Sequence, residues 1–170
     1  MKSEILKMLK ESSDYLSGQQ LCEIFGVSRT AVWKAVRQLE EEGYKIEAVR
    51  NKGYRLTEEA DVITQAELKS MFHTKWIGNR LEYFDETDST NIRARRLAEE
   101  GAPHGTLVVA DSQTAGKGRR GRAWTSPKGV GIWMSMVLRP PIKPSDASML
   151  TLVAGMAVVK GVKTSTGLNA

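Results

Sequence analysis

The sequence contains a single cysteine, Cys22, and no long hydrophobic run. One cysteine excludes a framework of intramolecular disulfides and favours a reducing compartment. The first residues, MKSEILKMLKE, carry too many charges for a secretory signal. The longest apolar run, from Met149 to Val159, is much shorter than the roughly 20 residues that span a bilayer. These absences predict a soluble, cytoplasmic protein with no membrane partner.

Histidine is also scarce, since His73 and His104 are the only two and neither has neighbours at metal-ligand spacing. We therefore predict no resident metal site. The remaining composition is that of a globular protein, with 41% hydrophobic and 26% charged residues. The net charge of +5 is unevenly distributed, because residues 1–60 carry ten basic and ten acidic side chains. The whole excess of positive charge lies in residues 61–170.

Three helices are predicted in the first sixty residues. Ile5, Leu6 and Leu9 repeat at helical spacing and indicate a first amphipathic helix. A second helix begins at Ser17 and is ended by a glycine at residue 26, and a third runs from a serine cap at residue 28 to about Glu42. Two helices joined by a glycine turn are typical of a helix-turn-helix motif.

A β-hairpin is predicted after the third helix. Apolar residues alternate on both sides of the turn Asn51, Lys52 and Gly53, which makes the whole unit a winged helix. Because a recognition helix enters the major groove with its first residues foremost, we expect DNA contacts from this helix and from the wing. The predicted DNA-binding residues are Ser28, Arg29, Thr30, Lys34, Arg37, Arg50 and Lys52. A protein-docking role stays open, since the net charge of residues 1–60 is zero.

A second domain is predicted to begin after the acidic linker TEEAD, residues 57–61, so that the two domains cover residues 1–60 and 61–170. The patterns indicate helices over 64–72, 89–100 and 146–161 or beyond, and strands over 81–85, 106–112 and 130–138. Because helices and strands do not alternate strictly, the expected fold class is α+β with a mixed sheet.

The segment QTAGKGRRGRAWTSP, from Gln113 to Pro127, contains four cations and three glycines. The glycines predict a flexible loop whose cations come together only around a bound anion, and arginine favours phosphate or carboxylate. The segment lacks the spacing of a Walker loop and of a dinucleotide-binding fingerprint. A solvated surface tether and a minor-groove hook remain alternatives at this point.

Two motifs of the second domain resemble those of the biotin protein ligase family. They are DSTN, residues 88–91, and DSQTAGKGRRGRAWTSPKGVGIWMSM, residues 111–136. With a winged helix in front, the chain is similar to the bifunctional form that is both biotin ligase and repressor of the biotin operon. The resemblance implies the N-terminal part of the catalytic domain of an ATP-dependent enzyme. Such an enzyme makes biotinyl-5'-AMP and transfers biotin to a lysine of a biotin carboxyl carrier protein.

The resemblance also implies roles for individual residues. Biotin is expected to bind at Ser89, Thr90, Asn91, Gln113, Lys117, Gly118 and Arg119. The adenylate is expected at Arg119, Arg120, Arg122 and Trp124, with Arg119 and Arg122 as the catalytic residues. Lys117 departs from the family, in which arginine is commoner. Ser89 and Thr90 also stand where a helix begins, so a plain N-cap is the alternative for them.

Further expectations concern ligands and partners. Mg²⁺ is expected to arrive with the ATP phosphates, because acids such as Asp88 before a helix are usually partners of its dipole. Retained adenylate is expected to favour a homodimer on operator DNA. The family pattern continues with a Lys-Trp-Pro-Asn-Asp segment and a small barrel that this sequence does not contain. A repressor that senses biotin or its adenylate without complete ligase activity therefore stays open. A related lipoate ligase, whose fold is similar, is the other alternative, although the arginine-rich segment argues against it.

Overall fold

The computed structural model describes residues 1–72 and 74–169, so His73 lies outside the described residues. The chain divides into two compact units, Met1–Leu138 and Arg139–Ala170. No helix in the described part of the chain is long and apolar enough to cross a membrane.

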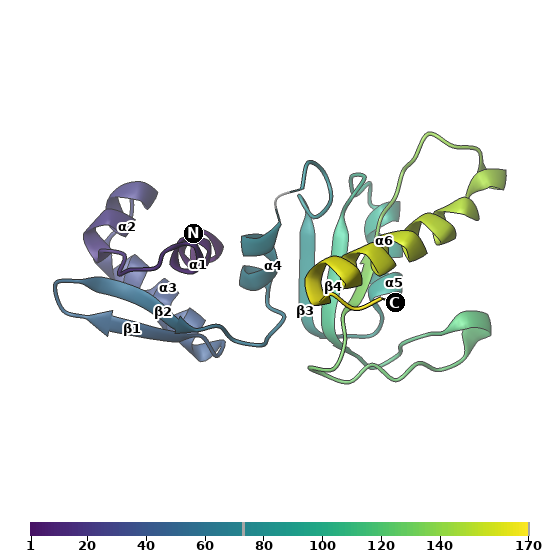
Figure 1. The fold of residues 1–170 in the computed structure, drawn as a ribbon. Helices are drawn as coiled ribbons and strands as arrows, with labels where there is room; N and C mark the ends of the chain where they lie inside the picture. Colours follow the sequence, from purple (N-terminus) through teal and green to yellow (C-terminus); the bar gives the residue numbers. More distant parts are fainter. Residues whose placement is uncertain (73, 170) are drawn as a thin grey trace. The chain divides into compact units, whose positions relative to one another are not determined.

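The first unit begins with the predicted winged helix, which is confirmed (Figure 1). Its helices are α1 (Lys2–Glu11), α2 (Gly18–Phe25) and α3 (Arg29–Glu41), and its wing consists of β1 (Lys45–Val49) and β2 (Gly53–Glu58). The serine hydroxyls at both predicted caps accept backbone N–H groups, from Gln19 in α2 and from Ala31 in α3. A left-handed glycine with φ 62° separates the two helices, as the sequence predicted.

The core of the winged helix contains residues from all three helices. Its buried members are Ile5, Leu6, Leu9, Leu21, Val32, Ala35, Val36, Leu39, Tyr44 and Ala66. Leu16 and Tyr54 exchange two backbone hydrogen bonds of 2.8 and 2.9 Å, which add a third, one-residue strand to the wing. This close approach requires Gly53, because a Cβ there would lie 2.0 Å from the Leu16 carbonyl oxygen.

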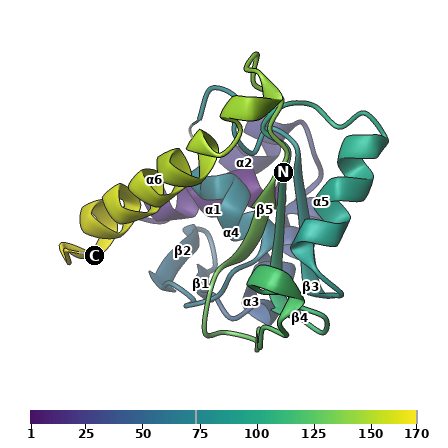
Figure 2. The same cartoon turned by 90° about the vertical axis from the view of Figure 1, so that its right-hand side faces the viewer.

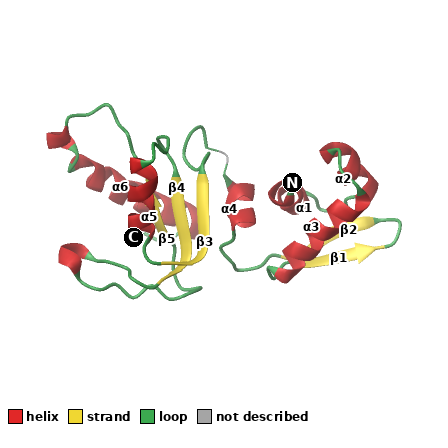
Figure 3. Ribbon diagram, turned by 180° about the vertical axis from the view of Figure 1, so that it is seen from behind, coloured by secondary structure: helices red, strands yellow, loops and turns green. Residues whose placement is uncertain are grey.

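A mixed three-stranded sheet follows in the same unit (Figure 3). The elements are α4 (Gln65–Met71), β3 (Leu81–Thr87), α5 (Thr90–Glu99), β4 (Leu107–Gln113) and β5 (Trp133–Met136). β4 is central, with β3 parallel and β5 antiparallel to it. The α+β class and the order of elements are confirmed, and β5 is shorter than the predicted strand over 130–138.

Alternate residues of β4 point to opposite faces of the sheet, and each face is covered by one helix. Val108 packs with Ala94 of α5, and Figure 2 shows α5 running alongside the strands. Leu107 and Val109 pack on the other face with Leu68 and Phe72 from α4 and its end. The period of two in β4 therefore builds a layer of sheet between two helices.

Helix α4 contacts both hydrophobic cores. Ala66 is buried in the core of the winged helix, whereas Leu68 packs against the sheet. The predicted domain boundary after residue 60 stays a prediction. The second unit, described by itself, contains the short 3₁₀ helix η2 (Pro144–Asp146) and the helix α6 (Met149–Thr166). The helix predicted over 146–161 or beyond is therefore confirmed, but it begins at Met149.

Candidate functional site

The basic segment forms a narrow antiparallel β-ribbon. The backbone N–H of Gln113 donates to the carbonyl of Ser126 (3.0 Å), that of Trp124 to Gly116 (2.9 Å), and that of Gly118 to Arg122 (2.7 Å). A 3₁₀ turn, η1 (Arg119–Gly121), closes the tip and is the short green turn in Figure 1. The expectation of a free loop is wrong, because the two arms hold each other by backbone hydrogen bonds. That the cations come together around a bound anion stays a prediction.

Gly116 lets the two arms of the ribbon approach. A Cβ at this position would lie 2.4 Å from the carbonyl oxygen of Trp124 and 2.8 Å from the hydroxyl oxygen of Ser126. Both contacts are too short for any larger residue without a shift of the ribbon. The sequence suggested flexibility as the reason for this glycine, but the structure shows a steric reason.

The ribbon displays its four cations to solvent. Lys117, Arg119, Arg120 and Arg122 are all exposed, and none of them forms an ion pair with another described residue. Four uncompensated charges on one short ribbon create a local positive potential. The surface is therefore suited to an anionic ligand.

A cavity of about 550 Å³ lies beside the ribbon and the start of α5. Its lining residues are Ser89, Thr90, Asn91, Ile92, Gln113, Lys117, Gly118, Trp124, Ile132, Trp133, Met134 and Ser135. The structure thus gathers seven of the residues expected at the biotin and adenylate sites. The other three, Arg119, Arg120 and Arg122, lie at and beside the ribbon tip and do not line the cavity.

The start of α5 is held by a side chain from β4. The Gln113 carbonyl oxygen Oε1 accepts from the backbone N–H of Thr90 (2.7 Å) and from its hydroxyl (3.1 Å). Ser89 occupies the N-cap position of α5, as the alternative predicted, but its side chain makes no cap hydrogen bond. Ser89 lines the cavity, and the Thr90 hydroxyl contacts Gln113 and Ser135 (3.0 Å).

Asp88 is engaged by the protein itself. Its carboxylate accepts from the backbone N–H of Ser89 (2.8 Å) and the hydroxyl of Thr87 (3.0 Å), and it pairs with Arg93 (3.1 Å). The hydrogen bond from the Ser89 N–H is the main cause that holds the pKa of Asp88 below its ordinary value. The interpretation of Asp88 as a partner of the helix N-terminus is confirmed.

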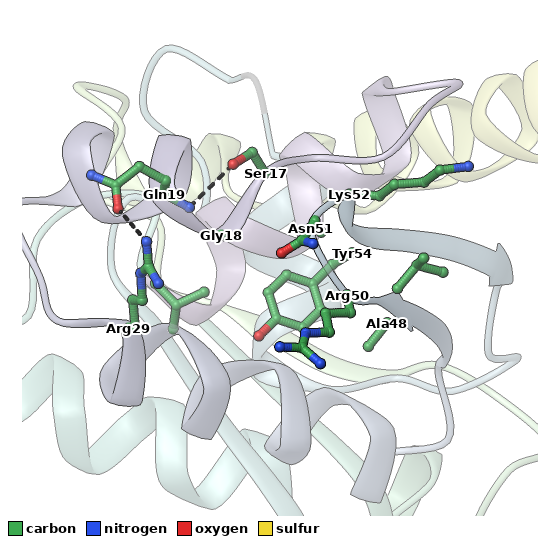
Figure 4. A pocket seen from close by; sticks show the side chains of 12 residues that line it. Ser17, Gly18, Gln19, Arg29, Ala48, Arg50, Asn51, Lys52 and Tyr54 are labelled. Atoms are coloured by element: carbon green, nitrogen blue, oxygen red, sulfur yellow. Dashed lines mark hydrogen bonds between the residues drawn. The ribbon is translucent and has the colours of Figure 1, made fainter.

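A second cavity, of about 480 Å³, lies between α3 and the wing (Figure 4). Its lining residues are Ser17, Gly18, Gln19, Arg29, Val32, Ala48, Val49, Arg50, Asn51, Lys52, Gly53 and Tyr54. Three cations and no acid are among them, so the cavity favours an anion. It gathers Arg29, Arg50 and Lys52 from the predicted DNA-binding residues.

The other predicted DNA-binding residues lie on α3 or at its cap, outside this cavity. Ser28, Thr30, Lys34 and Arg37 are exposed, and the charge of Arg37 is partly compensated by Glu40 at 2.9 Å.

Sequence reasoning missed three polar residues at these sites. Gln19 accepts a hydrogen bond from the guanidinium of Arg29 (3.0 Å), as Figure 4 shows. Ser126 accepts a hydrogen bond from the amide of Gln113, and Ser135 forms a hydrogen bond with the hydroxyl of Thr90. Both serines lie inside the quoted motif, but their inward orientation depends on the ribbon and on β5, which periodicity alone does not predict.

Comparison with known proteins assigns the two parts of the chain to two families of domains. Residues 2–55 match the model of an HTH domain, and residues 83–169 match that of the biotin/lipoate A/B protein ligase family. The chain belongs to the biotin/lipoate A/B protein ligase family. The resemblance drawn from DSTN and the basic segment is confirmed.

Among relatives of this family, the bifunctional ligase/repressor BirA of Bacillus spizizenii is 43% identical over 170 residues, which are 99% of this chain and 52% of that protein. The bifunctional ligase/repressor BirA of Escherichia coli is 32% identical over 89% of this chain and 46% of its own length. A solved biotin protein ligase from Aquifex aeolicus, in complex with biotin and ATP, is 37% identical over 53% of this chain and 37% of its own, with a TM-score of 0.45. The chain spans about half the length of the curated relatives it matches.

Proposed function

We propose that this chain carries the DNA-binding domain, residues 1–60, and the biotin- and adenylate-binding part, within residues 61–170, of a bifunctional biotin ligase and repressor. In the first half-reaction, the biotin carboxylate attacks the α-phosphorus of ATP, and pyrophosphate leaves. In the second, the amine of a carrier-protein lysine attacks the acyl carbon of biotinyl-5'-AMP, and AMP leaves. The observation that carries this proposal is the cavity shared by the start of α5, Gln113 and the basic ribbon.

The lining residues fit an uncharged ureido ring with a short carboxylate chain. The Ser89 hydroxyl and the Gln113 amide supply polar groups, and Trp133 and Met134 supply apolar surface. Asn91 and Gly118 complete the wall that we assign to biotin.

The ribbon supplies the charge that adenylate formation needs. Attack on the α-phosphorus places a carboxylate beside a triphosphate, and fixed cations stabilise the charge that builds there. We assign this role to Arg119 and Arg122, with Arg120 and Lys117 adding positive potential. Trp124, which is 58% exposed beside the cavity, offers a flat surface for the adenine ring. Mg²⁺ enters bound to the ATP phosphates, since Asp88 is already engaged by Ser89 and Arg93.

The winged helix supports the repressor function. Arg29, Arg50 and Lys52 surround one cavity without an acidic neighbour in its lining, which suits the phosphate backbone of operator DNA. We propose that adenylate binding favours a homodimer that binds two half-sites in the cytoplasm. The biotin carboxyl carrier protein is the proposed protein partner.

One observation favours a second candidate, a repressor that senses biotin or its adenylate without complete catalysis. Arg119 and Arg122 do not line the cavity, so a ligand could occupy the cavity without contact to the proposed catalytic cations.

Biotin-dependent exchange of labelled pyrophosphate into ATP separates the two functions, with lipoate added as a competitor. Exchange that an excess of lipoate leaves unchanged supports the biotin ligase. Biotin binding without exchange supports the sensor, and inhibition of exchange by lipoate would overturn the assignment to biotin.

A further inference from the structure

Ser126 is buried at the base of the ribbon, with 3% of its surface exposed. Its hydroxyl oxygen lies 2.9 Å from the amide nitrogen Nε2 of Gln113 and 3.5 Å from the carbonyl oxygen of Trp124. On the other side, Oε1 of Gln113 accepts two hydrogen bonds from Thr90, which is 4% exposed. One hydrogen-bonded series therefore runs from the ribbon to α5 through Trp124, Ser126, Gln113 and Thr90.

The direction of every hydrogen bond in this series is fixed by its two ends. The Trp124 carbonyl can only accept, so the Ser126 hydroxyl donates to it and accepts from Gln113. The Thr90 backbone N–H can only donate, so it must meet the oxygen end of the Gln113 amide. An amide turned by 180° would oppose donor to donor at Thr90, and such a mismatch in a buried site is costly.

We infer that Ser126 is a positioning residue of the proposed biotin cavity: it holds the Gln113 amide in one orientation and joins the returning arm of the ribbon to the start of α5. The inference rests on the proposed function, because Gln113 lines the cavity assigned to biotin. The series leaves the second hydrogen of Nε2 without a partner among the described residues. Gln113 therefore presents a donor to the ligand, which complements the carbonyl oxygen of a ureido ring.

Gly116 belongs to the same arrangement. A Cβ at Gly116 would lie 2.8 Å from the Ser126 hydroxyl oxygen and 3.5 Å from Nε2 of Gln113. The absence of a side chain at residue 116 therefore leaves the space in which Ser126 reaches the amide.

The test is the affinity for biotin, measured by calorimetry on the whole chain and on variants. We expect Ser126→Ala to weaken biotin binding about tenfold, because Nε2 of Gln113 loses its acceptor and the amide is then held from the Thr90 side alone. Ser126→Thr keeps the hydroxyl and should restore most of the affinity. Ser112→Ala is the matched control, since Ser112 is next to Gln113 but donates to the Asp85 carbonyl instead.

A double-mutant cycle with Gln113→Ala separates positioning from a general effect on stability. If Ser126 acts through Gln113, the double variant binds biotin no more weakly than Gln113→Ala alone. Additive losses, or Ser126→Ala with unchanged affinity, would overturn the inference while leaving the proposed function intact. A wild-type chain that does not bind biotin would instead contradict the proposed function itself. Thermal unfolding of each variant shows whether it has folded.

Discussion

The phenol of Tyr44, at the end of the winged helix core, donates a hydrogen bond to the carboxylate of Glu67 in α4. Tyr44 is 2% exposed, and Glu67 also pairs with Lys10 of α1. Thr64 caps α4 by accepting the backbone N–H of Glu67, while the Glu67 side chain contacts Tyr44 and Lys10. Helix α4 therefore packs against the winged helix through Ala66 and is also bound to it by polar contacts of Glu67.

Replacement of Glu67 by alanine should lower the free energy of unfolding by about 1–3 kcal/mol, because it leaves the buried Tyr44 hydroxyl and the Lys10 ammonium without their common acceptor. Glu59→Ala removes the other carboxylate on Lys10, at 3.0 Å, but Glu59 is 65% exposed. The Glu59→Ala control should lower the free energy of unfolding by less than about 1 kcal/mol. Chemical denaturation measures both values, and equal losses in the two variants would contradict the account.

Burial, followed by the hydrogen bond to Glu67, raises the pKa of Tyr44 above its ordinary value. The folded chain therefore keeps this proton at a pH where the unfolded chain has released it. The stabilising contribution is complete below about pH 10 and is lost as the pH rises further. In Tyr44→Phe, stability should fall less steeply above about pH 10 than in the wild type. Parallel curves of unfolding free energy against pH would refute this.

Gly116→Ala should open the ribbon, since its Cβ would lie 2.4 Å from the Trp124 carbonyl oxygen. Trypsin should then cut faster after the ribbon arginines, and the rate of cleavage at these sites is the measurement. Gly118→Ala is the matched control, because its Cβ would find only ordinary contacts, the nearest at 3.5 Å. Equal cleavage rates for the two variants would show that the ribbon does not depend on the close approach at Gly116.

Lys52→Ala should weaken binding to a mixed-sequence DNA duplex and reduce the slope of log K against log salt concentration by about 1, as expected for the loss of one phosphate contact. Lys45→Ala removes the same charge from a residue that pairs with Glu58 outside the cavity. Its slope should stay unchanged. A wing without DNA contacts would give the same slope for wild type and Lys52→Ala.

Local patterns were sufficient to predict most of the fold. The serine caps and the left-handed glycine between α2 and α3 depend on near neighbours in the chain, and they define the helix-turn-helix. The continuous apolar run at the start of β4, residues 107–110, is likewise typical of a strand with two buried faces. The Leu16–Tyr54 bridge was not predictable, because it joins segments that no periodic pattern connects.

The candidate site was predictable in composition but not in geometry. The motif residues indicated which groups would meet, and the cavity gathers Ser89, Thr90 and Gln113. The ribbon was mistaken for a free loop because its order comes from backbone hydrogen bonds between the arms, which glycine and arginine content does not reveal. Ser126 was missed for the same reason, since its burial depends on the pairing of Gln113 with Ser126.

Calorimetric titration of the chain with a non-hydrolysable analogue of biotinyl-5'-adenylate tests the central claim most directly. We expect one ligand per chain and at least about tenfold weaker binding by Arg119→Ala, because a charge-assisted contact to the phosphate is lost. Arg95→Ala, which removes an exposed α5 arginine paired with Glu99 at 3.2 Å, should bind as the wild type does. Absence of binding to the wild type, or equal affinity of Arg119→Ala and the wild type, would contradict the account.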